Sequence, residues 1–168
     1  MTFTKLLLII FSFVYLLKLY IYNNYCLNIT ASVPKGLYRL YKINKLKRND
    51  IVYIEIPDNA KHIIWDREYL PKHIKYLLKY VKGVPGDLVE VKENKLYINN
   101  KFEGNIKKYD SEGNSLISLA EGKFILKEQQ YLVLGNDDNS YDSRYFGLIK
   151  EREILKEAKF LREIGGKK

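Results

Sequence analysis

One serine and one lysine in the 168-residue sequence stand where a hydroxyl and an amine could become reactive. Ser32 is followed closely by a proline in a turn that enters an expected strand, and such a turn can expose the hydroxyl on rigid backbone. Lys79 lies within the apolar run 76–84. Because side chains alternate along a strand, Lys79 shares a face with Leu77 and Val81. An amine flanked by apolar groups is desolvated, which lowers its pKa and lets it take the proton of a serine hydroxyl.

The alternation alone does not select one lysine. Lys82 lies on the opposite face of the same strand, with Leu78 and Tyr80, and burial of that face would desolvate Lys82 instead. Serine near proline is also common in ordinary loops, and strand lysines usually face solvent. From these residues alone, both the identity of the active amine and the use of Ser32 stay open.

A third segment, 135–147, is dense in Asp, Asn, Ser and Gly and predicts a loop with many hydrogen-bonding groups. Within it, Asp142 and Arg144 can form a charge-assisted pair that stiffens the loop. The spacing of a calcium loop and its terminal Glu are missing, so we expect no calcium site. One cysteine and two histidines give too few soft ligands for structural zinc, and the sequence predicts neither a metal nor another cofactor.

The first 22 residues predict a membrane segment. Residues 6–17 form an unbroken apolar run, and after Lys18 the apolar character resumes through Tyr22. The stretch gives about 25 Å of helix against a bilayer core of roughly 30 Å, while Lys18 can reach the headgroups with its ammonium. Because no clean cleavage site follows, a retained anchor is favoured over a cleaved signal peptide. We therefore expect a transmembrane anchor over 1–22 and a globular domain over 23–168.

The net charge is +9, from 29 basic and 20 acidic residues. Such an excess suits anionic headgroups, nucleic acid or simply a solvated surface, and no RNA- or DNA-binding motif with interleaved aromatic residues accompanies it. The sequence thus predicts the lipid bilayer as a partner and no specific nucleic acid. The few charges around the apolar run do not fix the side of the membrane on which the domain lies.

The residues after the apolar run predict one mostly β domain, because short runs rich in β-branched and aromatic residues are bounded by turn signals. A short helix is expected over 58–69, stopped by Pro71, and a last strand or short helix over 151–161. There are no repeats and no linker of distinct composition. The expected strands are 37–41, 51–56, 76–84, 88–92, 95–98 and 131–134, with weaker ones within 101–109 and around 124–125.

Together and in this order, the segments resemble a known family. The stretch 32–38, Ser-Val-Pro-Lys-Gly-Leu-Tyr, resembles a nucleophile motif, and 77–87 carries a lysine ahead of Val-Pro-Gly-Asp. The stretch 142–147 is similar to a closing Asp-Ser-Arg motif. Over residues 4–161 the chain resembles the type I signal peptidases, which are membrane-anchored serine/lysine peptidases. Within this family it resembles the conjugative-transfer signal peptidases of TraF type. The stretch 67–71, Arg-Glu-Tyr-Leu-Pro, also resembles the sequence of this subgroup.

The resemblance implies roles for six residues. Ser32 falls on the nucleophile, and Lys79 rather than Lys82 falls on the general base. Thr30 matches the position whose hydroxyl joins the Ser32 backbone amide in an oxyanion hole. Three further positions match residues that support the dyad, the first of them by bonding the lysine amine: Ser140, Asp142 and Arg144.

The resemblance also implies a signal-peptidase-like β catalytic domain on the outer face of the bacterial cytoplasmic membrane, preceded by one transmembrane helix. Its activity would be the removal of signal or leader peptides from membrane-borne exported or pilin-type precursors through an acyl-enzyme, with cyclisation of the product as a further outcome. Two alternatives are a catalytically idle assembly factor of a secretion or conjugation apparatus and a self-cleaving regulator of phage-repressor type. The membrane span and the lack of a DNA-binding region argue against the regulator.

Overall fold

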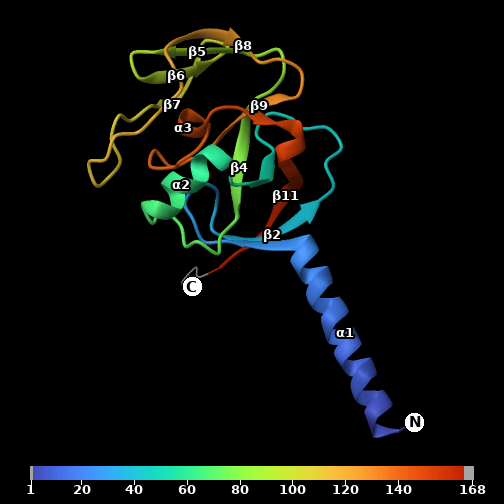
Figure 1. Ribbon diagram of the computed structural model, residues 1–168. Helices are drawn as coiled ribbons and strands as arrows, with labels where there is room; N and C mark the ends of the chain where they lie inside the picture. Colours follow the sequence, from blue (N-terminus) through green and yellow to red (C-terminus); the bar gives the residue numbers. More distant parts are fainter. Residues whose placement is uncertain (1, 165–168) are drawn as a thin grey trace.

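The computed structural model describes residues 2–164, and its first element is a long helix that projects away from the rest of the chain (Figure 1). Helix α1, Phe3–Asn24, has no buried residues, and its most apolar window has a mean hydropathy of 1.9. At 1.5 Å per residue its 22 residues extend over about 33 Å, so its length and composition are sufficient to cross a bilayer core. The apolar N-terminal helix expected from the sequence is therefore present and continues two residues past Tyr22.

Seven antiparallel strands form the main sheet, in the order β1-β2-β11-β3-β4-β9-β10. β1 continues directly from α1 and pairs with β2, with Tyr25 opposite Arg39. β4 lies between β3 and β9, so it is paired on both edges. The strands are β1 (Tyr25–Asn28), β2 (Gly36–Tyr41), β3 (Ile51–Glu55), β4 (Tyr76–Gly83), β9 (Gln130–Leu134), β10 (Ile149–Lys150) and β11 (Ile154–Glu163).

A smaller antiparallel sheet has the order β7-β6-β5-β8 and lies on the far side of the domain from α1 (Figure 1). β5 and β6 form the hairpin expected around Glu93-Asn94, where both residues have positive φ angles of 50° and 57°. Two successive positive φ angles are what a tight hairpin turn requires. The strands are β5 (Leu88–Lys92), β6 (Lys95–Ile98), β7 (Lys101–Asn105) and β8 (Gly122–Ile125).

β9 holds the two sheets together. Because side chains alternate along a strand, Tyr131 and Val133 enter the core of the main sheet, whereas Leu132 and Leu134 enter the core under the small sheet. Helix α2, Asp58–Asp66, packs Ala60 and Ile64 into the first of these cores. The short helix α3, Ser143–Phe146, follows β9 and is fully buried. The loop between β9 and α3 is therefore held by rigid elements at both ends.

The structure confirms a mostly β fold with one apolar N-terminal helix, and it corrects several details. α2 ends at Asp66 rather than at residue 69, because Glu68 has a positive φ angle of 54° that a helix cannot contain. The last segment is a 3-10 turn, Glu151–Glu153, followed by β11, so both expected forms occur in succession. Three short elements were not expected from the sequence: β1, α3 and β10.

Candidate active site

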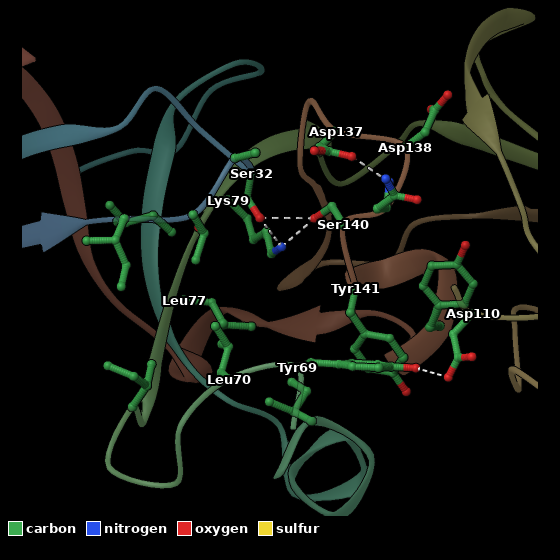
Figure 2. Close-up of a pocket in the computed structure, with 18 of the residues that line it drawn as sticks. Ser32, Tyr69, Leu70, Leu77, Lys79, Asp110, Asp137, Asp138, Ser140 and Tyr141 are labelled. Carbon is green, nitrogen blue, oxygen red and sulfur yellow. Dashed lines mark hydrogen bonds between the residues drawn. The ribbon is translucent and has the colours of Figure 1, made fainter. Parts of the chain in front are cut away.

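Side chains from three distant parts of the chain meet in one hydrogen-bonded cluster (Figure 2). Lys79 Nζ donates hydrogen bonds to Ser32 Oγ at 2.8 Å and to Ser140 Oγ at 2.5 Å, and the two serine oxygens are 3.1 Å apart. Ser32 comes from the turn between β1 and β2, Lys79 from the middle of β4, and Ser140 from the loop after β9. The structure thus brings together three of the residues that the resemblance selects.

Lys79 is almost completely buried, with 2% of its surface exposed. Its neighbours on the same face, Leu77 and Val81, belong to the core of the main sheet. Burial lowers the pKa of the Lys79 amine from its ordinary value of 10.5 to about 8, although the nearby charge of Asp142 acts in the opposite direction. About a tenth of the amine is then neutral at pH 7, a fraction several-hundred-fold larger than for an ordinary lysine.

Lys82 has a different environment. Its ammonium is half-exposed, donates a hydrogen bond to Asn49 Oδ1 at 2.9 Å and lies 5.3 Å from the centre of the Tyr80 ring. Strand alternation left the choice between the two lysines open. In the structure Lys79 contacts Ser32, whereas Lys82 bonds Asn49 instead.

A buried ion pair holds the loop that carries Ser140. The Arg144 guanidinium donates to both carboxylate oxygens of Asp142, at 2.9 and 2.8 Å, and the two side chains are 2% and 0% exposed. Arg144 also donates to the backbone oxygen of Ser140 at 3.2 Å, while Asp142 accepts from the backbone amide of Gly135 at 2.9 Å. Burial opposes the charge of Arg144, but the hydrogen bond and charge of Asp142 outweigh it and raise the pKa of Arg144. The pair therefore ties both ends of the loop, as a supporting pair would.

Gly135 has no space for a side chain. A Cβ atom there would lie 2.2 Å from Ser140 Oγ and 3.1 Å from the Cα of Ser32. The backbone amide of the next residue, Asn136, donates to the backbone oxygen of Ser32 at 2.8 Å, which explains the close approach. Any larger residue at position 135 would push the two serines away from the amine.

Asn28 organises the turn that carries Ser32, and the sequence analysis did not select it. Its side-chain amide donates to the backbone oxygens of Thr30, Val33 and Pro34, at 2.9, 2.9 and 3.2 Å. Its carbonyl oxygen accepts from both the backbone amide and the hydroxyl of Thr30, at 3.2 and 2.8 Å. No pattern in the sequence marks Asn28 for this role, because its burial and its partners exist only in the folded turn.

Thr30 lies close to the cluster but is turned from it. Because Asn28 Oδ1 can only accept, the single hydroxyl hydrogen of Thr30 is directed at Asn28. Thr30 nevertheless lines the same cavity as Ser32. In this arrangement the Thr30 oxygen, and not its hydrogen, is available to a molecule in the cavity.

A cavity of about 350 Å³ opens beside the three clustered side chains (Figure 2). One part of its lining is apolar and the other is polar. The apolar part includes Leu27, Ile29, Leu70, Ile74 and Leu77, and the polar part includes Tyr69, Lys107, Asp110, Asp137, Asp138 and Asn139. Within residues 2–164, no three His, Cys, Asp or Glu side chains are grouped to hold a metal ion. A hydroxyl bonded to a buried, easily neutralised amine at the edge of a cavity is an arrangement suited to nucleophilic acyl transfer.

Comparison with known proteins identifies the family. The family model described as signal peptidase, peptidase S26, matches residues 1–162, so the chain belongs to this family of signal-peptide-removing peptidases. The recognition made from the sequence motifs is therefore confirmed at the level of the family.

Two curated relatives agree with both parts of that recognition. The chain is 30% identical over 141 residues to a conjugal transfer protein TraF of Agrobacterium fabrum, covering 79% of each chain. It is also 30% identical over 125 residues to a signal peptidase I V of Bacillus subtilis, covering 68% of this chain and 66% of that protein. A solved signal peptidase I from Enterococcus faecalis is 26% identical, with a TM-score of 0.39, covering 67% of this chain and 96% of that one.

The turn that carries Ser32 should depend on Asn28. We expect Asn28→Asp to reduce the free energy of unfolding by roughly 2–3 kcal/mol, because a carboxylate cannot donate to the three backbone oxygens that the amide satisfies. Chemical denaturation of the full chain in detergent measures the loss. The control is Asn44→Asp on the exposed surface. An equal effect of the two substitutions would contradict the role of Asn28.

Lys79 should reduce stability. We expect Lys79→Met to stabilise the fold by about 3 kcal/mol at neutral pH, since burial lowers the pKa of this amine to about 8 and each pKa unit corresponds to about 1.4 kcal/mol. Between pH 8 and 10.5 the unfolded chain binds more protons at this position than the folded chain, so the stability of the parent should rise with pH. The advantage of the variant should shrink accordingly.

Denaturation curves at several pH values test this, with the half-exposed Lys82→Met as the matched control. The control should show a small effect with no such pH dependence. A Lys79→Met variant that is less stable than the parent at neutral pH would contradict the expectation.

Proposed function

We propose that the protein is a membrane-anchored serine endopeptidase that removes signal or leader peptides from membrane-borne precursors, with Ser32 as nucleophile and Lys79 as general base. The single observation that carries the proposal is the 2.8 Å contact between Ser32 Oγ and the buried amine of Lys79 at the edge of a cavity. Membership of the signal peptidase family and the similarity to a TraF protein support the same reaction.

The hydrogen-bond donors and acceptors of the cluster suit this reaction. A neutral Lys79 amine has two N–H groups and one lone pair, so it can keep donating to Ser140 while its lone pair accepts the proton of Ser32. Ser32 Oγ then bonds the scissile carbonyl carbon, and the Lys79 ammonium returns the proton to the leaving amine as the C–N bond breaks. Water hydrolyses the acyl-enzyme. An amine of the same chain in place of water would close a ring, which is the cyclisation variant of the proposal.

Thr30 is the proposed side-chain donor of the oxyanion hole, together with the backbone amide of Ser32. Its hydroxyl must first rotate away from Asn28 Oδ1, which accepts its hydrogen at 2.8 Å. This exchange is feasible because Asn28 also accepts from the backbone amide of Thr30 and stays satisfied. Ser140, Asp142 and Arg144 have the supporting roles that the resemblance implies, since they bond the amine or fix the loop that bonds it.

The connection between helix and site supports a membrane-borne substrate. Ser32 lies eight residues after the end of α1, so even a fully extended chain would place it within about 29 Å of the helix end. Leu27 and Ile29, on this connection, are 57% and 62% exposed and line the cavity. An apolar segment leaving the bilayer would therefore meet apolar side chains before it meets Ser32. We place the domain on the outer face of the bacterial cytoplasmic membrane, as the resemblance implies.

The idle assembly factor is the weaker hypothesis on physical grounds. A buried lysine with a depressed pKa reduces stability, and a protein without catalysis would gain from its replacement by an apolar residue. Ser32, Ser140 and the space at Gly135 are all arranged around this one amine. Such an arrangement has a purpose in proton transfer and none in a passive scaffold.

Loss of either dyad member should abolish processing. We expect Ser32→Ala and Lys79→Arg to leave a signal-bearing precursor uncut, because the first lacks the nucleophile and the second has a guanidinium that stays protonated. Lys82→Arg is the matched control and should keep the parent's activity. Mass spectrometry of the precursor after incubation in detergent reports the cut position and a linear or cyclic product. Cleavage by Lys79→Arg at the parent's rate would disprove Lys79 as base.

The pH dependence should report the same amine. Because Lys79 must be neutral to accept a proton, we expect kcat/KM to rise with pH to an inflection near 8 and to fall about tenfold per pH unit below it. Initial rates on one peptide substrate between about pH 6 and pH 10 measure the profile. A profile that is flat or decreasing with pH through this range would contradict the assignment.

A further inference from the structure

The long connection between β7 and β8 forms part of the cavity wall. Its residues 108–116 fold into a small hairpin, hereafter the 108–116 hairpin, with Tyr109 bridged to Ser115 and the amide of Leu116 donating to the oxygen of Lys108 at 2.8 Å. Tyr109, Asp110, Ser111 and Leu116 line the cavity. The hairpin therefore faces the site that contains Ser32 and Lys79, although it lies in a connection between two strands of the small sheet.

Little apolar burial holds this hairpin in place. Seven of its nine residues are exposed, and the two others are Asp110 and Leu116. The side chain of Asp110 is 7% exposed, which is unusual for a carboxylate on a surface turn. The position of the hairpin must therefore depend mainly on polar contacts. These are the contacts of Asp110 and the hydrogen bond that Arg67 Nη2 donates to the backbone oxygen of Ser115 at 3.0 Å.

Asp110 fastens the hairpin to the segment that follows α2. One carboxylate oxygen accepts from the Tyr69 hydroxyl at 2.5 Å and from Arg67 Nη1 at 3.1 Å. The other accepts from the backbone amides of Glu112 and Asn114, at 3.0 and 2.9 Å. The hydrogen bond from Tyr69 is the largest of the causes that lower the pKa of Asp110, so the carboxylate stays charged through the physiological range.

These four donors, together with the side-chain amide of Asn114 at 3.2 and 3.3 Å, occupy the accepting positions of the carboxylate. Asp110 is thus not free to bind a basic group of a substrate, even though it borders the cavity. Asp110 holds the hairpin in place. A substrate would contact the other side chains of the hairpin that line the cavity.

The same wall continues to the dyad. The Tyr69 ring lies 5.8 Å from that of Tyr141, centre to centre, and Tyr141 directly follows Ser140 (Figure 2). Directly before the hairpin, Lys107 Nζ donates to Asn139 Oδ1 at 2.6 Å, and the Lys107 amide donates to the Tyr145 hydroxyl at 3.1 Å. The hairpin and the residue before it therefore bridge the segment after α2 and the loop that carries Ser140.

We infer that Tyr69 and Asp110 determine substrate selection, by fastening the 108–116 hairpin as the wall that limits which side chains fit beside Ser32. The inference rests on the proposed peptidase function and adds the residues that set the width of its site. Release of the fastening would widen the cavity, weaken the binding of a well-fitting chain and admit bulkier side chains. It would leave the proton transfer between Ser32 and Lys79 unchanged, because neither Tyr69 nor Asp110 contacts them.

Tyr69→Phe removes the donor and keeps the ring, and Asp110→Asn removes the charge and keeps the shape. For each variant we expect KM for the preferred precursor peptide to rise about tenfold, the size of one hydrogen bond to a charged group, with kcat within about twofold. The pH inflection of kcat/KM should stay where the parent has it. Peptides with bulky residues next to the cut should become better substrates relative to the preferred one.

Matched controls are Tyr97→Phe on β6 and Asp66→Asn at the exposed end of α2, neither of which lines the cavity. The double variant Tyr69→Phe, Asp110→Asn should differ little from the more affected single variant, because both substitutions weaken the same hydrogen bond between Tyr69 and Asp110. Amide hydrogen exchange at 112–114 should accelerate in both single variants without any substrate present.

The outcomes separate the two proposals. A parent that cuts no precursor overturns the proposed function and, with it, the selection role. An active parent with the same KM and the same peptide preference in both variants overturns this inference alone. A loss of kcat with a moved pH inflection also overturns it, because the two residues would then act on the dyad.

Discussion

The whole site depends on keeping one amine out of water. A charged ammonium is costly to bury, and Lys79 is 2% exposed, so its pKa falls to about 8. That burial is possible because β4 is a central strand, paired with β3 and β9, and because Leu77 and Val81 on the same face belong to an apolar core. A lysine on an edge strand would reach solvent and keep its ordinary pKa. The order of strands in the main sheet is thus what makes the amine chemically useful.

The two loops that meet this amine are built differently. The turn with Ser32 is held by the neutral side chain of Asn28, which satisfies five backbone and side-chain groups of the turn. The loop with Ser140 is held by a buried ion pair, in which each of the three guanidinium nitrogens of Arg144 donates to an acceptor. Removing one member of a buried pair leaves an unpaired charge, so the second loop depends on both Asp142 and Arg144. The first turn is held by neutral hydrogen bonds, and it contains Thr30, the residue that must reorient in the proposed reaction.

The sequence was sufficient to predict what local patterns determine. The apolar helix, the β5–β6 hairpin around Glu93-Asn94 and the mostly β class follow from hydropathy, turn residues and alternation. It was insufficient for β1 and β10, which are four and two residues long and exist because a neighbouring strand pairs with them. The end of α2 was also missed, since the positive φ of Glu68 lies between Arg67 and Tyr69, two residues that bond Asp110 far along the chain.

In the candidate site, too, local patterns predicted some residues, and contacts between distant segments determine the others. Alternation assigned Lys79 and Lys82 to opposite faces but could not say which lysine is buried, because Leu78 on the face of Lys82 is buried as well. The motif resemblance chose Lys79, which is the lysine that contacts Ser32. Asn28 and Asp110 were not selected, because their importance lies in partners that the fold brings together, up to 41 positions away for Tyr69 and Asp110. Residues that react have motifs, whereas residues that position them are recognised by their contacts.

A single strand connects the reactive centre to the wall that encloses it. β9 sends alternate side chains into the cores of both sheets and then leads into the loop with Ser140, while the small sheet supplies the 108–116 hairpin. A displacement of the small sheet relative to the main sheet would have to disturb these packed side chains and the hydrogen bond from Arg144 to the backbone oxygen of Asn105 at the end of β7. The 108–116 hairpin is held differently, by the polar contacts of Asp110 and Arg67. The residues proposed to select the substrate are therefore fastened by contacts that do not involve Ser32 or Lys79.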